Sequence, residues 1–408
     1  MPDADTLTHS LAVRYQQVRQ LTEMLCDPLE VEDYCASGEN TQSVKWYLGH
    51  VCWVIEQTLL LPFIPQYQPY RQQFDQIFNF TPAKAVMQWS RPTLIDVLDY
   101  RQHVDEQVTG LLHSDYDEAF AQALELCLQY EQMQQENILV TIKSMFAANP
   151  LMPSYQAKPP KRQTDVKPIS FCRYAQQIAP IGHSGKGVCF ATELPRHEVL
   201  IGAFELADRP VCNQDVLDFI ADGGYQNAAL WTVSGWQWRT EHNVTKPNYW
   251  RQQNSWKEYT LNGWQSLNPA ATTCHLSFFE AQAIARWFGA RLPSEFEWEW
   301  ASAELSVQGN FLDHGYMHPS PGLAGTGMRQ MFGDVWQWTT SQAAMYPTAQ
   351  DNSLLINQFL SSDLHSKQVL RGGSCFTGAS LVRHSSRKFL TADERGYMTG
   401  LRLARSIA

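Results

Sequence analysis

Residues 128–142 read LQYEQMQQENILVTI and form the middle of a long stretch with helical character, which we predict as a helix over residues 116–146. Tyr130 and Gln134 are four residues apart in this stretch, so a helix places both side chains on one face. The stretch therefore predicts a long helix and, on one side of it, a pair of polar side chains.

Three further helices are predicted in the first 150 residues, which are rich in helical periodicity and poor in glycine. They cover residues 8–25, 43–61 and 93–112, and the second is expected to end before Pro62. In the third, apolar residues recur mostly at three- and four-residue steps, which predicts one buried face. Four such helices indicate an all-α four-helix bundle, a fold whose interior commonly hosts a metal. The bundle alone implies no chemistry.

The composition of the chain changes after residue 150. Residues 151–170 read LMPSYQAKPPKRQTDVKPIS, have no apolar period and resemble an extended linker. We therefore predict a bundle over residues 1–150, a linker over 151–180 and a second domain over 181–408. Short apolar runs such as residues 198–204, many turns and a few short helices predict an irregular, loop-rich α+β domain for this last part.

Two short helices of the second domain are marked by capping boxes, one at Ser277 with Glu280 and one at Ser294 with Glu297. The same part of the chain is dense in tryptophan, so we expect aromatic packing to stabilise it. Eleven of the fourteen tryptophans lie there, at positions Trp231, Trp236, Trp238, Trp250, Trp256, Trp264, Trp287, Trp298, Trp300, Trp336 and Trp338.

Length, charge and cysteine content exclude several classes of protein. A chain of 408 residues exceeds one ordinary core, and two domains are expected. The net charge of −10, with scattered Lys and Arg, argues against nucleic acid and anionic membranes as partners. Nine widely spaced cysteines without a C-x-x-C pair fit a reducing cytoplasm. No signal peptide and no run of about 18 apolar residues is evident, so we expect a soluble, unprocessed protein.

Several short motifs follow one another in a fixed order. The first part carries KWYLGHVCWVIEQTLL at residues 45–60 and YRQHVD at residues 100–105, and the second carries IGHSGKG, ELPRH, LADRPVCN, FIADGGY, ARWFGARLPSEFEWE, FGDVWQWT, VLRGGSC and GLRLAR. In these motifs the chain resembles, over nearly its whole length, the iron-dependent sulfoxide synthases of ergothioneine biosynthesis. The resemblance implies a DinB-like bundle followed by a formylglycine-generating-enzyme-like, or sulfatase-modifying-factor-like, domain related to C-type lectins, with a small-molecule site in the cleft between them.

The family that the chain resembles joins a thiol oxidatively to the imidazole of a trimethylated histidine, using Fe(II) held by three histidines. Such chemistry needs a facial ligand set with open positions for thiolate and oxygen. The resemblance places His50 at the first iron ligand, but Tyr130 and Gln134 stand where the family carries the histidines of His-x-x-x-His-x-Glu. Glu136, the acidic member of that motif, remains. We therefore predict a degenerate metal site with weak or absent iron binding.

Further departures fall on residues that the family uses for its substrates. Ala343 stands where the resemblance predicts the acid-donating tyrosine, and Val86 and Met87 replace an arginine–glycine pair associated with the carboxylates of the thiol substrate. Near the C-terminus Gly396 replaces a tryptophan. Four charged residues of this region are kept and are candidate substrate-binding residues: Arg383, Arg387, Asp393 and Arg395.

Each of these residues also has a structural interpretation. His50 can be a core histidine bonded to Glu131 or Gln134. Tyr130 and Gln134 can be a polar pair that fills the former metal cavity, and a ferric phenolate is the alternative. Cys375 lies near the catalytic cysteine of true formylglycine-generating enzymes but has no second cysteine beside it, so we assign it to packing.

Asp393 and Arg387 are most simply an ion pair.

Two functional hypotheses follow. The chain is either a catalytically inactive or repurposed homologue that binds a small molecule or a protein, or an active oxidoreductase of the sulfoxide-synthase type whose rebuilt site uses His50, Glu136 and neighbours such as Tyr130 and Glu131. The simultaneous change of metal, acid and substrate residues favours the first. The oligomeric state and the identity of any ligand do not follow from the sequence.

Overall fold

The computed structural model describes residues 4–38, 41–79, 91–155, 165–322, 327–347, 349, 354–362 and 364–407, with side chains from residue 11 onward. The chain divides into two compact units. A helical unit comprises residues 1–149 together with 185–192 and 350–362, and a second unit comprises 150–184, 193–349 and 363–408. Two short segments that follow residue 150 in the sequence therefore belong to the helical unit.

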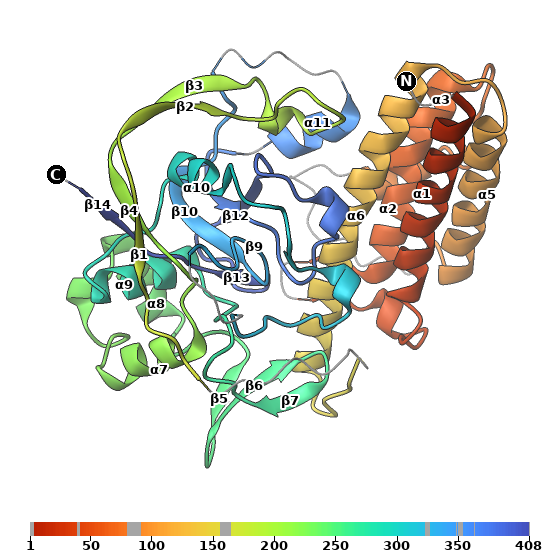
Figure 1. Ribbon diagram of the computed structural model, residues 1–408. Helices are drawn as coiled ribbons and strands as arrows, with labels where there is room; N and C mark the ends of the chain where they lie inside the picture. The colour runs from red at the N-terminus through yellow and green to blue at the C-terminus, as the bar shows by residue number, and fades with distance from the viewer. Residues whose placement is uncertain are drawn as a thin grey trace. The chain divides into compact units, whose positions relative to one another are not determined.

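The helical unit is built around four long helical segments, in which α2 packs on α5 and α6, and α1 packs on α6 and α5 (Figure 1). Helix α11, from the segment around residue 355, also packs on α6. The elements are α1 (Ala4–Met24), η1 (Asp33–Cys35), α2 (Val44–Ile55), η2 (Glu56–Leu60), α3 (Leu61–Phe63), α4 (Phe74–Phe78), α5 (Leu94–Leu112), α6 (Glu118–Ala148) and α11 (Leu355–Ser361).

Local sequence signals explain where the long helices begin. Thr93 caps α5 by accepting a hydrogen bond from the Asp96 backbone, while the Asp96 carboxylate accepts one from the Thr93 backbone at 2.9 Å. Asp117 caps α6 in the same manner through the backbone of Phe120. Both caps satisfy amide groups that have no partner inside the helix.

The predicted end of the second helix before Pro62 is wrong. Helix α2 passes into a π-helical turn, η2, and continues through α3 to Phe63. Pro62 occupies one of the first positions of α3, directly after the π turn. The π turn shifts the hydrogen-bond register, as the bond from the Leu61 backbone to the Glu56 carbonyl shows.

In the part of the second unit that the structure describes, short helices combine with five small sheets, and this irregular α+β character agrees with the sequence-based prediction. The largest sheet has the order β12-β11-β10-β13, and a second has the order β1-β4-β14. The strands are β1 (Phe171–Tyr174), β2 (Gln177–Ile181), β3 (His197–Ile201), β4 (Phe204–Ala207), β5 (Trp250–Gln252), β6 (Trp256–Thr260), β7 (Gly263–Ser266), β8 (Gly309–Asn310), β9 (Phe332–Gly333), β10 (Trp336–Gln342), β11 (Lys367–Arg371), β12 (Lys388–Thr391), β13 (Thr399–Gly400) and β14 (Ala404–Ser406).

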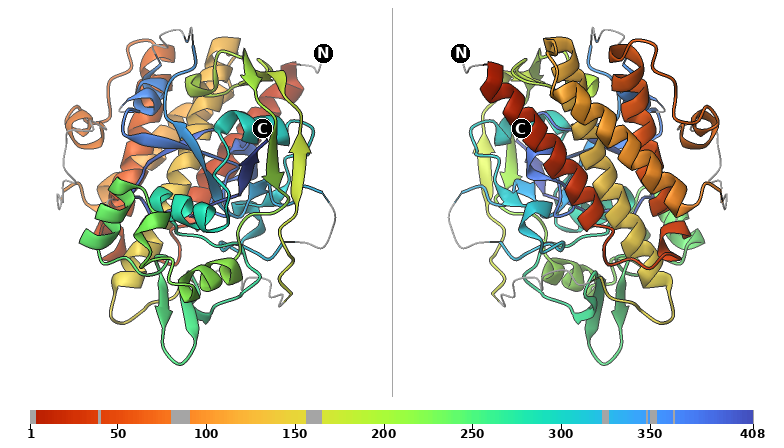
Figure 2. Two further views of the ribbon diagram at one scale, coloured as in Figure 1. Left: turned by 90° about the vertical axis from the view of Figure 1, so that its left-hand side faces the viewer. Right: turned by 90° about the vertical axis from the view of Figure 1, so that its right-hand side faces the viewer.

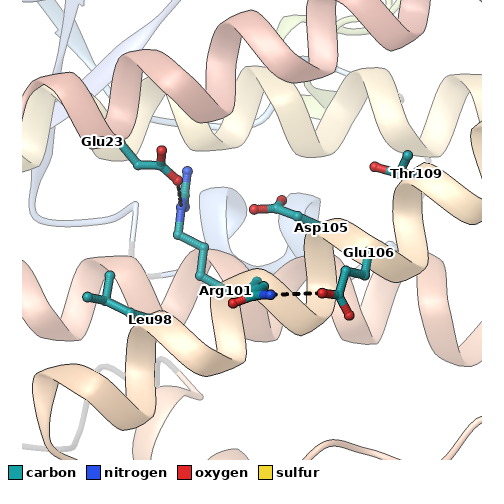
Figure 3. A pocket seen from close by; sticks show the side chains of 7 residues that line it. Glu23, Leu98, Arg101, Asp105, Glu106 and Thr109 are labelled. Atoms are coloured by element: carbon teal, nitrogen blue, oxygen red, sulfur yellow. Dashed lines mark hydrogen bonds and ion pairs between the residues drawn. The ribbon is translucent and has the colours of Figure 1, made fainter.

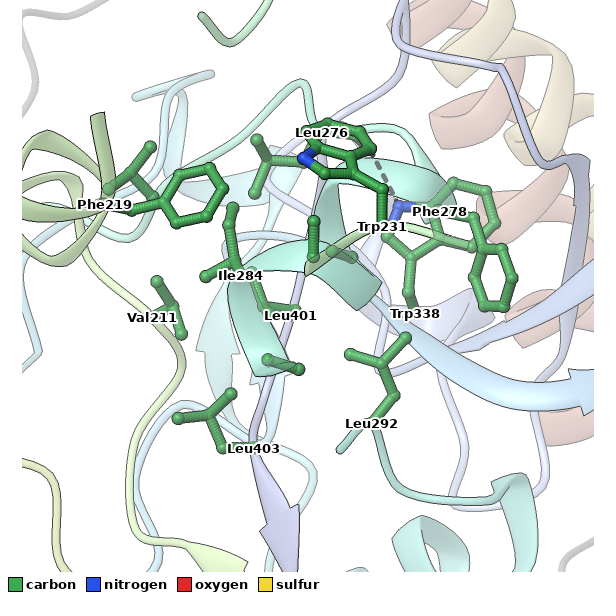
Figure 4. Packing of buried hydrophobic residues seen from close by; sticks show 14 of the residues in the cluster. Val211, Phe219, Trp231, Leu276, Phe278, Ile284, Leu292, Trp338, Leu401 and Leu403 are labelled. Carbon is green, nitrogen blue, oxygen red and sulfur yellow. Dashed lines mark hydrogen bonds between the residues drawn. The ribbon is translucent and has the colours of Figure 1, made fainter. Parts of the chain in front are cut away.

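The helices of the second unit are short and well capped. Ser277 and Ser294 form the two predicted capping boxes with Glu280 and Glu297. A large apolar core with several aromatic rings lies beside α9 and includes Phe219, Trp231, Phe278 and Trp338 (Figure 4). The helices are α7 (Asn213–Ala221), η4 (Ala228–Leu230), α8 (Val233–Glu241), α9 (Phe278–Trp287), α10 (Glu295–Ser302), η5 (Leu312–His314) and η6 (Ala379–Leu381).

Part of the range 151–180, expected as a linker, is folded. Residues 171–174 form β1, which pairs antiparallel with β4, and residues 177–181 form β2, which pairs with β3. The apolar residues of this short range were too few to show a period, and the paired residues lie 16 (Ile181 and His197) to 36 (Phe171 and Ala207) positions further along the chain. Among the described residues, no helix has the length and apolar character needed to cross a bilayer.

Candidate functional site

His50 lies on α2 and has both ring nitrogens in hydrogen bonds. Nδ1 is 2.7 Å from the carbonyl oxygen of Phe78, and Nε2 is 2.7 Å from the hydroxyl of Tyr130 on α6. A carbonyl oxygen can only accept, so Nδ1 carries the proton and donates it to Phe78. Nε2 is then the acceptor, and the Tyr130 hydroxyl donates to it. A neutral imidazole satisfies both contacts.

Aromatic rings surround this pair. The ring of Trp46 stacks on the His50 ring with centroids 4.5 Å apart and an angle of 12°. Phe359 of α11 lies 5.9 Å from His50 and 6.4 Å from Tyr130, measured between ring centroids. The backbone that precedes His50 is also tightly packed, because a Cβ on Gly49 would lie 2.2 Å from the Phe78 ring. Only 1% of His50 is exposed.

Burial sets the protonation states of the pair. Loss of hydration lowers the pKa of His50 to about 4, against a smaller opposite effect of the hydrogen bond to Phe78. Burial also raises the pKa of the Tyr130 phenol well above its ordinary value. At neutral pH both groups are therefore uncharged, and a phenolate that could serve as a metal ligand is disfavoured.

Gln134 and Glu136, the other two residues predicted for this site, lie on the same helix as Tyr130. The Gln134 side chain accepts a hydrogen bond from the Asn137 amide at 2.8 Å. Glu136 is buried, with 1% exposed, but it follows Gln134 by two positions. Side chains two apart on a helix do not share a face. The structure thus brings His50 and Tyr130 into contact, while helix geometry puts Glu136 on a different face from Gln134.

The residues around His50 do not fit iron. Both imidazole nitrogens are engaged, the phenol is held in its protonated form, and an amide is a poor ligand for ferrous iron. Among the residues that the structure describes, no group of three or more His, Cys, Asp or Glu side chains is arranged to hold a metal ion. A facial ligand set cannot be assembled here from the side chains in their present positions.

The partners expected for a core His50, Glu131 or Gln134, were incorrect, because the Gln134 amide oxygen accepts from Asn137 and Glu131 is used elsewhere. Its carboxylate accepts from Arg19 at 3.0 Å, from Arg101 at 3.2 Å and from Thr22 at 2.7 Å. Burial raises the pKa of Glu131, but the two guanidinium groups outweigh it and lower the pKa. Two arginines from α1 and α5 therefore hold this carboxylate, and His50 takes Tyr130 and Phe78 instead.

The candidate substrate arginines of the second unit are already paired with carboxylates. Arg383 binds Glu193 at 2.5 and 3.1 Å. Arg387 is bidentate to Glu295 at 2.9 and 3.1 Å. Arg395 contacts Glu280 at 3.0 Å through two nitrogens.

These bonds satisfy much of the capacity of each guanidinium. A substrate carboxylate would have to displace an internal one.

The ion pair predicted between Asp393 and Arg387 is absent. Asp393 is exposed, and Arg387 is buried against Glu295 and under the ring of Tyr346, with its guanidinium carbon 4.3 Å from the ring centroid. A buried guanidinium requires a buried counter-charge, which Glu295 on α10 supplies. Sequence proximity had favoured Asp393, although the partner lies 92 positions away.

The other residues that differ from the family pattern are found in different surroundings. Ala343 is buried beside Leu364 and Val369, so its position is filled by apolar packing. Val86 and Met87 lie outside the described residues. Cys375 is buried, which agrees with its assignment to packing.

The sequence-based prediction missed Phe359, which reaches the His50 pair from the second half of the chain. No local pattern of residues 354–362 signals this contact.

Comparison with known proteins identifies the family. The model of the sulfatase-modifying factor enzyme 1-like domain matches residues 178–319 and 315–407, and the chain belongs to this family. Hercynine oxygenase of Mycolicibacterium thermoresistibile is 28% identical over 310 residues, covering 69% of this chain and 68% of that protein. Hercynine oxygenase of Mycobacterium tuberculosis is 34% identical over 237 residues, covering 52% and 55%. The predicted relationship to this group is thereby confirmed.

A third relative lies outside the hercynine oxygenases. The inactive C-alpha-formylglycine-generating enzyme 2 of Mus musculus is 27% identical over 220 residues, covering 43% of this chain and 68% of that protein. The chain spans only about half the length of the Mycobacterium tuberculosis relative, so the similarity by itself transfers no activity.

Proposed function

We propose that this chain is a non-catalytic homologue of the hercynine oxygenases, in which the former iron position has become part of the core. The observation that supports this proposal most strongly is the hydrogen bonding of His50. Its Nε2 accepts a hydrogen bond from the Tyr130 hydroxyl at 2.7 Å, and its Nδ1 donates one to the Phe78 carbonyl. A metal ion would have to break a buried hydrogen bond and displace a neutral phenol. Both changes oppose binding.

The substrate side supports the same proposal. Family members must hold charged substrates, yet Arg383, Arg387 and Arg395 each hold an internal glutamate. Breaking one such buried pair leaves an uncompensated charge, which costs several kcal/mol. Ala343, placed where the family carries its acid, has no proton to give.

The proposal also contains the finer expectations that follow from the resemblance. They are a DinB-like identity for the four-helix part, a cytoplasmic location, and a small molecule or protein as the remaining partner. The competing hypothesis is an active oxidoreductase with a rebuilt metal site that uses His50.

Metal content and product formation separate the two hypotheses. The chain is purified without chelators, loaded anaerobically with Fe(II) and incubated with hercynine, oxygen and either cysteine or γ-glutamylcysteine. We expect iron far below one per chain and no sulfoxide by mass spectrometry. A bacterial hercynine oxygenase treated identically is the positive control. Iron near one per chain, with product that disappears in His50→Ala, would establish the active alternative.

A further inference from the structure

Two exposed apolar side chains lie next to each other on the ribbon formed by strands β2 and β3 (Figure 1), and Figure 2 shows this ribbon from two further sides. Ile178 of β2 is 64% exposed and Leu200 of β3 is 67% exposed, and the two residues are paired across the strands. The other face of the ribbon is buried and includes Ala179 and Ile181. The exposed face is therefore the outer surface of a two-stranded sheet whose inner face belongs to the core.

The exposed leucine of α5 has different surroundings. Leu98 is 44% exposed, but it shares its face of α5 with the charged residues Arg101 and Asp105 (Figure 3). No charged side chain stands between Ile178 and Leu200, because the two are direct partners in the ladder. The ribbon thus presents a continuous apolar pair to solvent.

Pro180 fixes which backbone groups of the ribbon point outward. It is paired with Glu198 and has no N–H, so this pair cannot exchange two hydrogen bonds and must be of the non-hydrogen-bonded type. The two types alternate along an antiparallel ladder, so Ile178 and Leu200 form the next pair of this type. The N–H and C=O groups of Glu198 and Leu200 therefore point away from β2, toward the outer edge of β3.

The two edges of the ribbon differ. On the β2 side Pro180 offers no donor, and the N–H of Gly182 donates to the carboxylate of Glu299 at 2.7 Å. On the β3 side, none of the described residues makes a hydrogen bond to the outward groups of Glu198 or Leu200. The ribbon therefore has one closed edge and one open edge.

Strand β14 limits the open edge. It pairs with β4, which follows β3, and the N–H of Ile407 donates to the carbonyl of Ala203 at 3.3 Å. Gly202 precedes this contact, is exposed, and has no atom within 4 Å of the place that a Cβ would take. Within the described part of the chain, the uncovered edge thus runs from Glu198 to Gly202 and has Leu200 at its centre.

We propose that this edge is a self-association surface, at which two copies of the chain pair residues 198–202 antiparallel about a two-fold axis at Leu200. In this register Leu200 exchanges both of its outward hydrogen bonds with Leu200 of the second copy, and Glu198 faces Gly202, which has no side chain. Ile178 and Leu200 of both copies then form one apolar row across four strands. The two Glu198 carboxylates stand at opposite ends of the paired segment, so no like charges oppose each other.

The closed edge explains why a second copy is the expected occupant. A two-fold pairing uses the same open edge of each copy and leaves the Pro180 edges on the outside of the new sheet. Those edges lack a donor, so the sheet does not grow further and the assembly stops at two copies. The paired segment is short, and the association should therefore be weak and depend on concentration.

Disulfide cross-linking tests the register. Leu200→Cys places two thiols on directly opposed residues whose Cα atoms are about 5.5 Å apart, within the range of about 4.4–6.8 Å that a disulfide spans. Ile178→Cys is the matched control, because Ile178 has a similar exposure on the same face, but its two copies are separated by three strand spacings, about 14 Å.

The oxidant is oxidised glutathione, and the parent chain controls for its nine native cysteines. On non-reducing gels we expect the covalent dimer to form at least about tenfold faster in Leu200→Cys than in Ile178→Cys or the parent, since a larger separation requires backbone movement. Equal rates in the two cysteine variants would overturn the proposed pairing.

Sedimentation velocity of the full chain tests the association itself. We expect a reversible monomer–dimer equilibrium that Leu200→Lys weakens at least about tenfold, because two lysines replace an apolar pair at directly opposed positions. Val233→Lys is the control, since Val233 is 89% exposed but lies on α8, outside the ribbon, and should leave the equilibrium unchanged. Both side chains are exposed, so the melting temperatures should equal that of the parent. A parent chain that stays monomeric at all concentrations, or equal weakening in both variants, would refute self-association at this edge.

Discussion

Tyr130 and Glu131 are neighbours on α6, yet they belong to two different kinds of buried polar centre. Tyr130 faces α2 and forms an uncharged pair with His50 among aromatic rings. Glu131 faces α1 and α5 and forms a charged network with Arg19 and Arg101. Successive helix positions point in different directions, so a single step along the sequence separates the two centres.

The comparison shows that a buried histidine and a buried carboxylate respond differently to loss of solvent. The histidine can become neutral at small cost, and the hydrogen bonds to its two ring nitrogens, not the loss of charge, make it unavailable to a metal. The carboxylate keeps its charge because two guanidinium groups stabilise it. We therefore expect the charged centre to dominate stability and the neutral centre to decide whether His50 can bind a metal.

The largest expected effect comes from the charged centre. Glu131→Gln leaves Arg19 and Arg101 buried without this counter-charge, and we expect the free energy of unfolding to fall by about 3–5 kcal/mol. Urea denaturation followed by circular dichroism measures the loss. Glu118→Gln, at an exposed position of the same helix, should change it by less than about 0.5 kcal/mol. A similar small change in Glu131→Gln would show that the network is not a stabilising centre.

The neutral centre can be tested by restoring the two missing imidazoles. Tyr130→His with Gln134→His removes the hydroxyl that occupies His50 Nε2 and places two imidazoles at i and i+4 opposite it. We expect Fe(II) affinity to rise at least about a hundredfold, by the scale of ligand and outer-shell effects in metal sites. Anaerobic titration measures it, with Tyr130→Ala and Gln134→Ala as the control.

Turnover should stay low in this double variant because Ala343 still has no proton to donate. An unchanged iron affinity, at unchanged circular dichroism spectrum and melting temperature, would mean that Phe359 and the other surrounding rings have closed the cavity permanently.

The pH dependence of stability reports on His50 directly. Its pKa in the folded chain is about 4 and near 6.5 when unfolded, so the unfolded chain binds the extra proton between these values. Stability from this group is complete above pH 6.5 and is lost as the pH falls toward 4, at about 1.4 kcal/mol per pH unit. At pH 5 the loss is about 2 kcal/mol relative to pH 7.

Denaturation of the parent and of His50→Gln at pH 5 and 7 isolates this contribution. The unfolded chain binds more protons than the folded chain over this pH interval, and removing His50 should reduce that difference by close to one proton. Identical pH slopes for the two proteins would mean that His50 titrates normally and is not buried as described.

The smallest expected effect concerns one hydroxyl group. Tyr130→Phe leaves His50 Nε2 as a buried acceptor without its present donor, and we expect a destabilisation of about 1–2 kcal/mol. Tyr34→Phe is a matched control, because the Tyr34 hydroxyl bonds to the Cys26 carbonyl in a less buried place. Chemical denaturation compares the two. Equal losses of unfolding free energy in the two variants would indicate that the hydrogen bond to His50 contributes no more to stability than the bond of Tyr34.

Much of the fold was predictable because its signals are local. The helix predicted over residues 93–112 matches α5 (Leu94–Leu112), since the Thr93–Asp96 cap and the apolar spacing lie within a few residues of each other. The capping boxes at Ser277 and Ser294 are equally local. Pro62 misled the prediction because the π turn that accommodates it depends on hydrogen-bond register, which residue type does not reveal.

The candidate site was only partly predictable. The resemblance placed His50 opposite Tyr130, and the structure brings the two within 2.7 Å. The partner of Arg387 was mistaken, because Glu295 lies far away in sequence and on another element. Arg383 and Arg395 were candidates for substrate binding, and their glutamate partners, Glu193 and Glu280, could not be read from the motifs that contain them.

The sequence by itself determined where the long helices α5 and α6 form, where helices are capped and which residues stand at the positions that the resemblance assigns to iron ligands, because residue identity and short-range spacing carry that information. The tertiary structure alone decided that His50 is neutral with both ring nitrogens in hydrogen bonds and that Phe359 packs against it. Burial and the arrangement of charges depend on residues that are distant in sequence, and these two quantities fix protonation and ligand binding.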